Sequence, residues 1–192
     1  MSRDQILALI DAAVAAITAN AEELTRLDQA IGDGDHGSNM ARGFQAIGAQ
    51  REALAAMEPG DALQKAGMVL VTTVGGASGP LYGSLLMGIG NGLKAGKDPA
   101  DAFAEGVESV KKRGKSDVGA KTMLDVLVPV LEAFQLGAGR TASESREATK
   151  PMLATRGRAS FLGERSIGHC DPGATSSCLL IQVTCDVLKP TA

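Results

Sequence analysis

The sequence predicts an all-α protein, and three observations support this fold class. Only 3% of the 192 residues are aromatic, whereas β-strands favour aromatic and β-branched side chains. Apolar residues make up 44% of the chain, with Ala and Leu prominent, which suits a helical core. They recur at intervals of three and four, as in Leu7, Ile10, Val14 and Ile17, which is the helical period. The length suits one domain spanning residues 1–192, because no linker divides the chain.

Eight helical segments are predicted, separated by turns that contain Gly or Pro. They span Asp4–Ile31, Asn39–Met57, Asp61–Val74, Ser78–Lys94, Asp98–Lys112, Lys121–Leu136, Thr141–Arg156 and Pro172–Leu188. The first keeps its period up to Gly32, the second ends before a Pro-Gly pair, and the third ends at a Gly-Gly pair. Within the third, the β-branched run Met68–Val74 is the strongest strand candidate, but a buried helix end is favoured.

The later helices carry signals at their boundaries. The fourth opens on Ser-Gly-Pro at Ser78 and the fifth on Asp-Pro at Asp98, where a capping side chain precedes an early proline. The sixth contains Pro129, which is expected to kink it or shift its register. The seventh begins with a Thr-x-x-Glu capping box at Thr141. The eighth is apolar almost all round and is therefore expected to be buried.

Charge and composition argue against several classes of protein. The net charge of -3 gives no basic face for nucleic acid. No apolar run reaches the ~18 residues that span a bilayer. Asp4 precedes and Asp11 interrupts the apolar run Ile6–Ile17, so the N-terminus does not have the pattern of a signal peptide. Three cysteines, without a CxxC pair, favour a reducing cytosol, so a cytoplasmic location is expected. Cys178 and Cys185, seven residues apart on one helix face, are expected in the core.

The break after the first helix carries three carboxylates within eight positions. Asp28 lies on the last helical turn, and Asp33 and Asp35 lie in the loop. Carboxylates this close repel one another unless a cation neutralises them, and hard oxygen ligands suit Mg²⁺ or Ca²⁺. The alternative is a loop in which each Asp caps a backbone N–H. Metal binding is favoured, and His36 is not counted as a ligand because Mg²⁺ prefers oxygen.

Familiar nucleotide and calcium motifs do not account for this segment. A formal GxGxxG begins at Gly32, but it follows a helix and not a strand, which argues against a dinucleotide fold. An EF-hand loop starting at Asp33 would need Gly at its sixth position and Glu at its twelfth, where this chain has Ser38 and Phe44. The Walker A pattern GxxxxGK[ST] does not occur in the chain.

Two further breaks suit phosphate. Residues 75–80 precede the fourth helix, and a Gly-rich turn at a helix N-terminus exposes N–H groups, although an ordinary tight turn is the alternative. Residues 157–173 form a long irregular stretch in which Arg158 and Arg165 could bind phosphate or form structural ion pairs. Asp171 begins a turn and a helix, where N-capping is its simplest role. A weaker candidate is the entry to the sixth helix at Gly119 and Thr122.

Four blocks of sequence, taken together and in this order, resemble the nucleotide-binding (L) subunit of bacterial dihydroxyacetone kinases. They are LDQAIGDGDHGSNM from Leu27, GGASGPLYGS from Gly75, GAKTMLDVL from Gly119 and GRASFLGERSIGHCDPGATS from Gly157. The resemblance implies a barrel of eight antiparallel amphipathic helices with the nucleotide at one rim, in agreement with the eight predicted segments. One departure is Ala120, which stands where many members have Asp.

The resemblance also implies roles for individual residues. Asp28, Asp33 and Asp35 are similar to the ligands of two Mg²⁺ ions that bridge to the phosphates of ADP or ATP. The expected phosphate-side contacts are His36, Gly37, Ser38, Asn39, Ala77 and Ser78. Contacts near the base and ribose are expected from Gly119, Thr122 and Met123. A closing lid is expected from Arg158, Asp171, Pro172 and Gly173.

A partner chain is expected, because in this family a separate K subunit or domain holds the small substrate. The expected chemistry is phosphoryl transfer, with the aspartates as metal ligands and not as bases. The phosphoryl donor is either ATP from solution or a protein of the sugar phosphotransferase system that recharges bound ADP. The oligomeric state, including a homodimer, stays open.

Other functions remain as alternatives at this stage. One is a kinase subunit for another polyol, keto-sugar or acyl substrate, and another is a metal-dependent phosphatase. A third is a non-catalytic nucleotide-sensing subunit that binds a regulator. The triple-Asp segment argues against pure sensing, because a sensor does not need a clamp of two metals.

Overall fold

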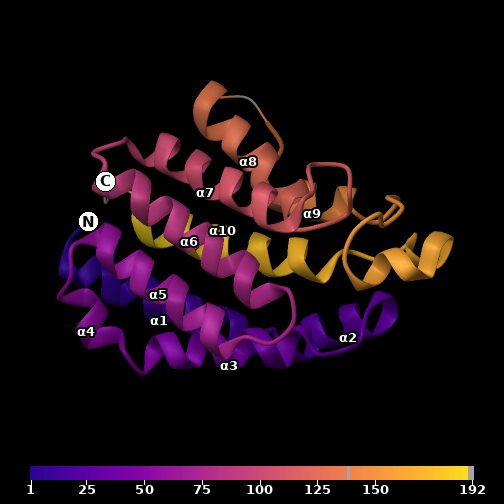
Figure 1. Cartoon of the computed structure of the whole chain (residues 1–192), viewed down its shortest axis with the longest axis horizontal. Helices are drawn as coiled ribbons and strands as arrows, with labels where there is room; N and C mark the ends of the chain where they lie inside the picture. The colour runs from indigo at the N-terminus through magenta and orange to yellow at the C-terminus, as the bar shows by residue number, and fades with distance from the viewer. Residues whose placement is uncertain (138, 190–192) are drawn as a thin grey trace.

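All regular structure is helical in the computed structural model, which describes residues 1–137 and 139–189 (Figure 1). The α-helices are α1 (Arg3–Ala19), α2 (Ala21–Ile31), α3 (His36–Gly48), α4 (Arg51–Ala55), α5 (Pro59–Thr73), α6 (Ser78–Lys94), α7 (Pro99–Gly114), α8 (Leu124–Leu136), α9 (Ala142–Ala148) and α10 (Pro172–Leu188). A 3₁₀ segment, η1 (Arg158–Ser166), lies between α9 and α10. The all-α prediction therefore holds, and Met68–Val74 is the end of a helix and not a strand.

Two of the predicted helices are each divided in two. The first bends by 54° between α1 and α2, where the Asn20 side chain donates a hydrogen bond to the Ala16 carbonyl (2.8 Å). Asn competes for backbone hydrogen bonds in this way, which favours a break. The second predicted helix is interrupted after Gly48 and resumes as the short α4. It also begins earlier than predicted, because the Asp35 carbonyl accepts the Asn39 N–H (2.9 Å) and closes a turn at His36.

Two other boundaries differ from prediction for identifiable reasons. The predicted helix Thr141–Arg156 ends at Ala148, shortly before Pro151, which cannot continue a helix. Its capping box at Thr141 and Glu144 is present as predicted. The predicted start of α8 at Lys121 is three residues too early, because Lys121 has a left-handed backbone (φ +60°) and the helix begins at Leu124. The helix then continues through Pro129 to Leu136.

The helices pack lengthwise into one elongated body. α5, α6 and α7 lie side by side, α1 packs against α3 and α10, and α8 packs against α7, α9 and α10. The start of α1 and the end of α10 lie at one end of this body, whereas the end of α2, the 3₁₀ segment and the start of α10 gather at the opposite end (Figure 1). That opposite end carries most of the predicted site.

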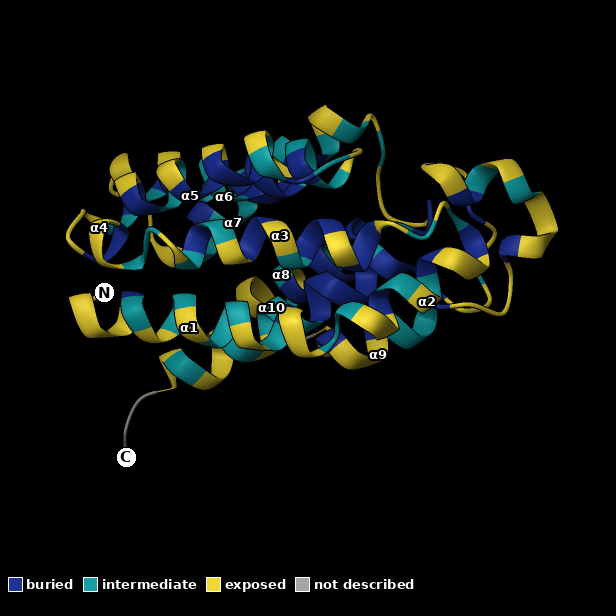
Figure 2. Ribbon diagram, turned by 90° about the horizontal axis from the view of Figure 1, so that it is seen from below, coloured by how far each residue is buried: buried dark blue, intermediate teal, exposed yellow. Residues whose placement is uncertain are grey.

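The core runs through the interior of the body (Figure 2). It includes the fully buried side chains Ile17, Leu24, Met40, Leu70 and Leu124. Of the cysteines expected in the core, Cys178 is buried, but Cys185 is exposed, because the last turns of α10 extend beyond the helices that cover its start. The prediction for Cys185 was therefore wrong.

Among the described residues, no single helix is long and apolar enough to cross a membrane. The bent pair α1 and α2 meets the criteria of length and composition only when its two helices are taken together.

Candidate metal and nucleotide site

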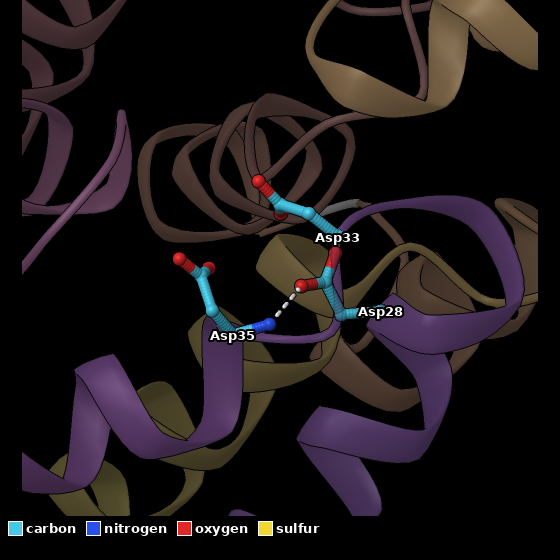
Figure 3. Close-up of side chains that lie close together, drawn as sticks. All are labelled: Asp28, Asp33 and Asp35. Atoms are coloured by element: carbon cyan, nitrogen blue, oxygen red, sulfur yellow. Dashed lines mark hydrogen bonds between the residues drawn. The ribbon is translucent and has the colours of Figure 1, made fainter.

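Three carboxylates converge where α2 ends and α3 begins (Figure 3). Asp28 lies in the last turn of α2, Asp33 lies in the connecting loop, and Asp35 is the residue before α3. One oxygen from each can be chosen so that all three lie within 4.8 Å of one another. Asp28 is buried, whereas Asp33 and Asp35 are exposed, so the cluster has a protein side and an open side.

Asp28 is held in place from two directions. Its Oδ2 accepts hydrogen bonds from the backbone N–H groups of Asp35 (2.8 Å) and His36 (3.1 Å). Its Oδ1 occupies space that a side chain at Gly32 would fill, since a Cβ there would lie 2.0 Å from that oxygen. The glycine and the two N–H groups together fix the orientation of this carboxylate.

This donor set fits a hard divalent cation. All three groups are carboxylates, and their mutual repulsion at this separation is relieved when a cation lies between them. The Arg158 Nε, 3.0 Å from Asp33 Oδ2, is the cationic side chain that pairs with the cluster among the described residues. Arg158 is itself largely exposed, with 71% of its side chain accessible, so this pair is readily exchanged for another cation.

A cavity of about 630 Å³ opens beside the carboxylates. The predicted site residues that line it are Asp28, Asp33, Asp35, His36, Ala77, Ser78, Thr122, Met123, Arg158, Asp171, Pro172 and Gly173. They come from five breaks between helices, so the structure gathers segments that lie far apart in the sequence. The volume is within the range of small-molecule sites.

Four predicted contacts do not line this cavity. Gly37 faces α2, where a Cβ would lie 1.9 Å from the Ala21 carbonyl. Ser38 is exposed and donates to the Asp35 carbonyl, and the buried Asn39 accepts from Arg42. Their side chains point elsewhere because α3 begins at His36. Gly119 instead borders a second, more open depression of about 730 Å³, whose charged lining consists of three lysines, Arg156, Glu108 and Asp117.

The His36 ring links three helices beneath the cavity. Its Nδ1 lies 3.1 Å from Ser78 Oγ at the start of α6, and its Nε2 lies 2.9 Å from Ser176 Oγ in α10. Burial lowers the pKa of the ring, although Asp28 and Asp35 oppose this effect. Both nitrogens are thus engaged by hydroxyl groups, which suits a positioning role for the ring.

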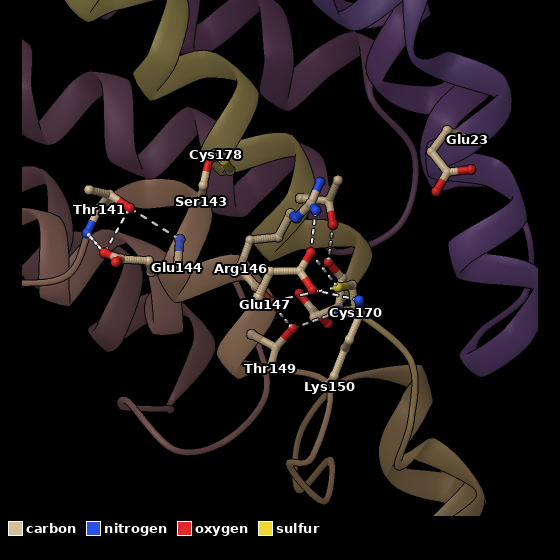
Figure 4. A network of polar contacts seen from close by, with 12 residues as sticks. Glu23, Thr141, Ser143, Glu144, Arg146, Glu147, Thr149, Lys150, Cys170 and Cys178 are labelled. Carbon is tan, nitrogen blue, oxygen red and sulfur yellow. Dashed lines mark hydrogen bonds and ion pairs between the residues drawn. The ribbon is translucent and has the colours of Figure 1, made fainter.

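Asp171 begins α10 at the far wall of the cavity. Its Oδ2 accepts the Ala174 N–H (2.7 Å), which is the predicted N-cap. Its own N–H donates to Thr149 Oγ1 (3.0 Å), at the edge of a polar network that includes Arg146, Glu147 and Cys170 (Figure 4). Burial raises the pKa of the Asp171 carboxyl to about 7.

Sequence reasoning missed three buried polar residues that shape the site. Asp125 accepts the N–H groups of Gly119 (2.6 Å) and Thr122 (2.7 Å), which orders the entry to α8. The Thr-x-x-Asp spacing from Thr122, similar to a capping box, could have identified it. Tyr82 OH bonds to Ser176 (2.7 Å) and to the Gly173 carbonyl (3.1 Å). Lys121 is almost fully buried, and no sequence signal distinguished it from a surface lysine.

Comparison with known proteins shows the family. Residues 30–186 match the model of the DAK2 domain. The chain belongs to the DAK2 domain family. This DAK2 domain is 44% identical over 173 residues to the ADP-binding subunit DhaL of PEP-dependent dihydroxyacetone kinase 1 from Listeria innocua, covering 85% of this chain and 86% of that protein. It is 38% identical over 201 residues to the corresponding DhaL subunit from Escherichia coli, covering 95% and 96%.

The fold of this DAK2 domain is shared with a solved structure. Dihydroxyacetone kinase from C. freundii, in complex with AMP-PNP and Mg²⁺, matches with a TM-score of 0.77 at 22% identity. The match covers 94% of this chain and 33% of the longer C. freundii chain. The resemblance stated from the sequence blocks is therefore confirmed at the level of family and helical fold.

Proposed function

We propose that this DAK2 domain is the nucleotide-binding subunit of a dihydroxyacetone, or related keto-sugar, kinase. The single observation that carries the proposal is the carboxylate cluster of Asp28, Asp33 and Asp35 at the mouth of the 630 Å³ cavity. The names of the Listeria and E. coli relatives, both ADP-binding subunits of such kinases, support it. We treat residues 1–192 as one such domain, acting in the cytoplasm.

Three sets of residues would hold the nucleotide and its metal. Asp28, Asp33 and Asp35 would bind Mg²⁺, with two ions proposed, and the metal would neutralise charge on the phosphates of ADP or ATP. The first turn of α6 has no side-chain cap, so its N–H groups at Ala77 and Ser78 are available to phosphate oxygens. Thr122 and Met123 would border the base and ribose.

Arg158 would change partners when nucleotide binds. Its guanidinium pairs with Asp33 now, and a cation at Asp33 would release it toward the phosphates, to which Arg can bind in bidentate fashion. Among the described residues that line the cavity, the Asp28, Asp33 and Asp35 carboxylates would face the metal, Asp171 caps α10 by accepting the Ala174 N–H, and the His36 ring is bonded to two serines, so none of them is assigned as a general base. Activation of the acceptor hydroxyl is therefore assigned to a partner K subunit that holds the substrate.

The phosphoryl donor is proposed to be a protein of the phosphotransferase system. The relatives from Listeria and E. coli belong to PEP-dependent kinases, which supports recharging of bound ADP over exchange of ATP. Such recharging requires the nucleotide to stay bound through many turnovers. The cavity is lined by residues from the ends of several helices, including α2, α6, α8 and α10, so a bound nucleotide could contact many of them at once, which suits retention.

Asp33→Asn tests the metal assignment, because it keeps the shape of the side chain and removes its charge. Calorimetric titration with ADP in the presence of Mg²⁺ should show at least a tenfold loss of affinity, as expected when a metal ligand is weakened. Asp61→Asn, a change at an exposed residue of α5, is the matched control. Equal Mg²⁺-dependent affinity in the Asp33 variant and the wild type would refute the proposal.

A further inference from the structure

Lys121 occupies an unusual position for a lysine. Only 1% of the residue is exposed, although lysine is rarely buried without a partner. Its backbone lies in the left-handed region (φ +60°), which a bulky side chain rarely adopts. A strained backbone at a buried charged residue persists only when the surrounding structure requires it, and such positions gather at functional sites. Lys121 also lines the cavity beside the carboxylates.

The Lys121 ammonium is held by backbone carbonyls. Nζ donates to the carbonyl of Met152 (3.1 Å) and to that of Ser166 (2.5 Å). These two carbonyls belong to the first and last residues of the segment 152–166, which we call the 152–166 loop. Within the described part of the chain, no carboxylate forms an ion pair with Nζ, so these carbonyls are the partners that compensate its burial.

Other bonds show that the base of the 152–166 loop is closed on Lys121. The Thr155 N–H donates to the carbonyl of Ala120, the neighbour of Lys121 (3.2 Å). Ser166 Oγ accepts the Ala154 N–H (3.0 Å), which draws the two ends of the loop together. Toward its tip the loop is exposed, with Phe161 84% accessible. The hydrogen bonds at the base are therefore a main contact that positions the loop.

The 152–166 loop carries Arg158, whose Nε lies 3.0 Å from Asp33. A second contact, the small apolar cluster of Ile31, Ala154 and Ala159, packs the loop on the end of α2. Apolar packing of this kind is not directional, whereas the two hydrogen bonds from Lys121 join both ends of the loop to one side chain, beside the backbone bond from Gly168 to Lys150 (2.7 Å). The orientation of Arg158 toward the carboxylates thus depends in part on a side chain that lies outside the loop.

We propose that Lys121 is a positioning residue that closes the base of the 152–166 loop and thereby holds Arg158 over the Asp28–Asp33–Asp35 cluster. We call this contact of Lys121 with the two ends of the loop the tether, and it does not depend on bound nucleotide. Its effect on nucleotide rests on the proposed function.

Limited trypsin digestion of the nucleotide-free protein tests the tether. Lys121→Met keeps the length of the side chain and removes the donors, and it should increase cleavage after Arg156, Arg158 and Arg165 several-fold, with other sites protected. Lys112→Met, at an exposed lysine of α7, is the control with the same change of charge and should cleave like the wild type. Lys121→Arg, which retains donors and charge, should restore protection in part. Unchanged cleavage of a folded Lys121→Met protein would overturn the tether.

Ser166→Ala provides a second variant if Lys121→Met does not fold. It removes the hydroxyl that bonds Ala154 and Gly163 but leaves both carbonyls that Lys121 contacts. It should loosen the base of the loop and raise cleavage at the same three arginines, less than Lys121→Met is expected to. Protection equal to the wild type in the Ser166 variant, with Lys121→Met unfolded, would also count against the proposal.

A double-mutant cycle on affinity for ADP with Mg²⁺ tests the link to Arg158. Lys121→Met should weaken binding about tenfold in the wild-type background and less than twofold in an Arg158→Ala background, because its effect passes through that residue. Additive losses would overturn the positioning role and leave a merely structural one. Absence of any binding by the wild type would refute the proposed function instead, and the trypsin result would still decide the tether.

Discussion

At the scale of single residues, the absence of a side chain at Gly32 allows the orientation of the Asp28 carboxylate. A Cβ at Gly32 would lie 2.0 Å from Asp28 Oδ1 and 3.0 Å from the Asp28 carbonyl, so Gly32→Ala must turn the carboxylate away from Asp33 and Asp35. Mg²⁺ affinity, measured by calorimetry, should fall by about 10- to 100-fold, as is usual when the support of a ligand is lost.

The helical circular dichroism of the Gly32 variant should be retained, because the clash involves one side chain at the end of α2. Gly114→Ala is a suitable control, since a Cβ there would meet Leu81 at 3.4 Å, an ordinary contact. Wild-type Mg²⁺ affinity in the Gly32 variant would show that Asp28 does not need its observed orientation.

The contribution of Glu147 to the stability of the fold is expected to depend on pH. Lys150 and Arg146 beside it lower the pKa of this half-buried carboxyl to about 2. A lowered pKa in the folded state means that the contribution to stability is present above the ordinary value of about 4.5 and is lost as the pH falls toward 2. Glu147→Gln should therefore lower the melting temperature slightly at pH 6, and the difference from wild type should vanish near pH 2.

Exposed ion pairs are weak, so the difference at pH 6 is expected to be small but resolvable by calorimetry. Glu22→Gln, a change at an exposed residue of α2, serves as the control for loss of a carboxylate. A difference that grows between pH 4.5 and pH 2 would contradict the sign of this linkage.

The sequence predicted the carboxylates better than their neighbours, for a physical reason. Three Asp residues within eight positions repel one another wherever the helices end, so Asp28, Asp33 and Asp35 do not depend on exact boundaries. The directions of Gly37 and Asn39 do depend on the exact helix boundary, because a helix that begins at His36 turns each successive residue by 100°. Lys121 was missed because its burial depends on loop carbonyls more than 30 positions away.

At the scale of elements, glycine sets how closely α5, α6 and α7 approach. A Cβ at Gly106 of α7 would lie 2.6 Å from an Ile89 side-chain carbon and 2.9 Å from the Leu85 carbonyl of α6. The second contact is with backbone and can be relieved only by a shift of the helices. Gly106→Ala should therefore destabilise the protein by about 1–2 kcal/mol, as overpacking outweighs the ~1 kcal/mol gain in helix propensity.

Gly114→Ala, at the last residue of the same helix, separates the two effects. It has the same change in propensity without the clash, so its stability should be unchanged or higher in urea unfolding. A stabilised Gly106→Ala protein would show that α6 and α7 can move apart at little cost.

Elements with local signals were predicted well, and elements without them were not. Asp98, Thr141 and Asp171 each cap the helix that their sequence pattern indicated. The prediction of a cap at Ser78 was wrong, because the residue before α6 is Ala77 and this helix has no side-chain cap. The 3₁₀ segment η1 has no such signal, because contacts of its loop with Lys121 and the end of α2 determine its path. The helical period also continues across Asn20, so the 54° bend there was not visible in the pattern of apolar residues.

At the scale of the whole molecule, the site is formed by helix ends that meet at one end of the body. The ends or beginnings of α2, α3, α6, α8 and α10 line the cavity, so no single element contains the site. Their Gly-rich breaks were visible in the sequence, but their meeting at one place was inferred only through the resemblance to a family. Binding at such a site should stabilise all five helices together.

Thermal unfolding with ADP and Mg²⁺ tests this coupling. A ligand at a hundred times its Kd stabilises the native state by about 2.7 kcal/mol, which corresponds to a rise in Tm of about 5–10 °C for a chain of this size. ADP without Mg²⁺, in EDTA, should give almost no rise, because its phosphates would face three uncompensated carboxylates. Mg²⁺ alone should give a small rise through the carboxylates, so the effect of both should exceed the sum of the two. An equal rise with ADP in EDTA would place the nucleotide away from Asp28, Asp33 and Asp35, since only binding beside that cluster makes the metal necessary.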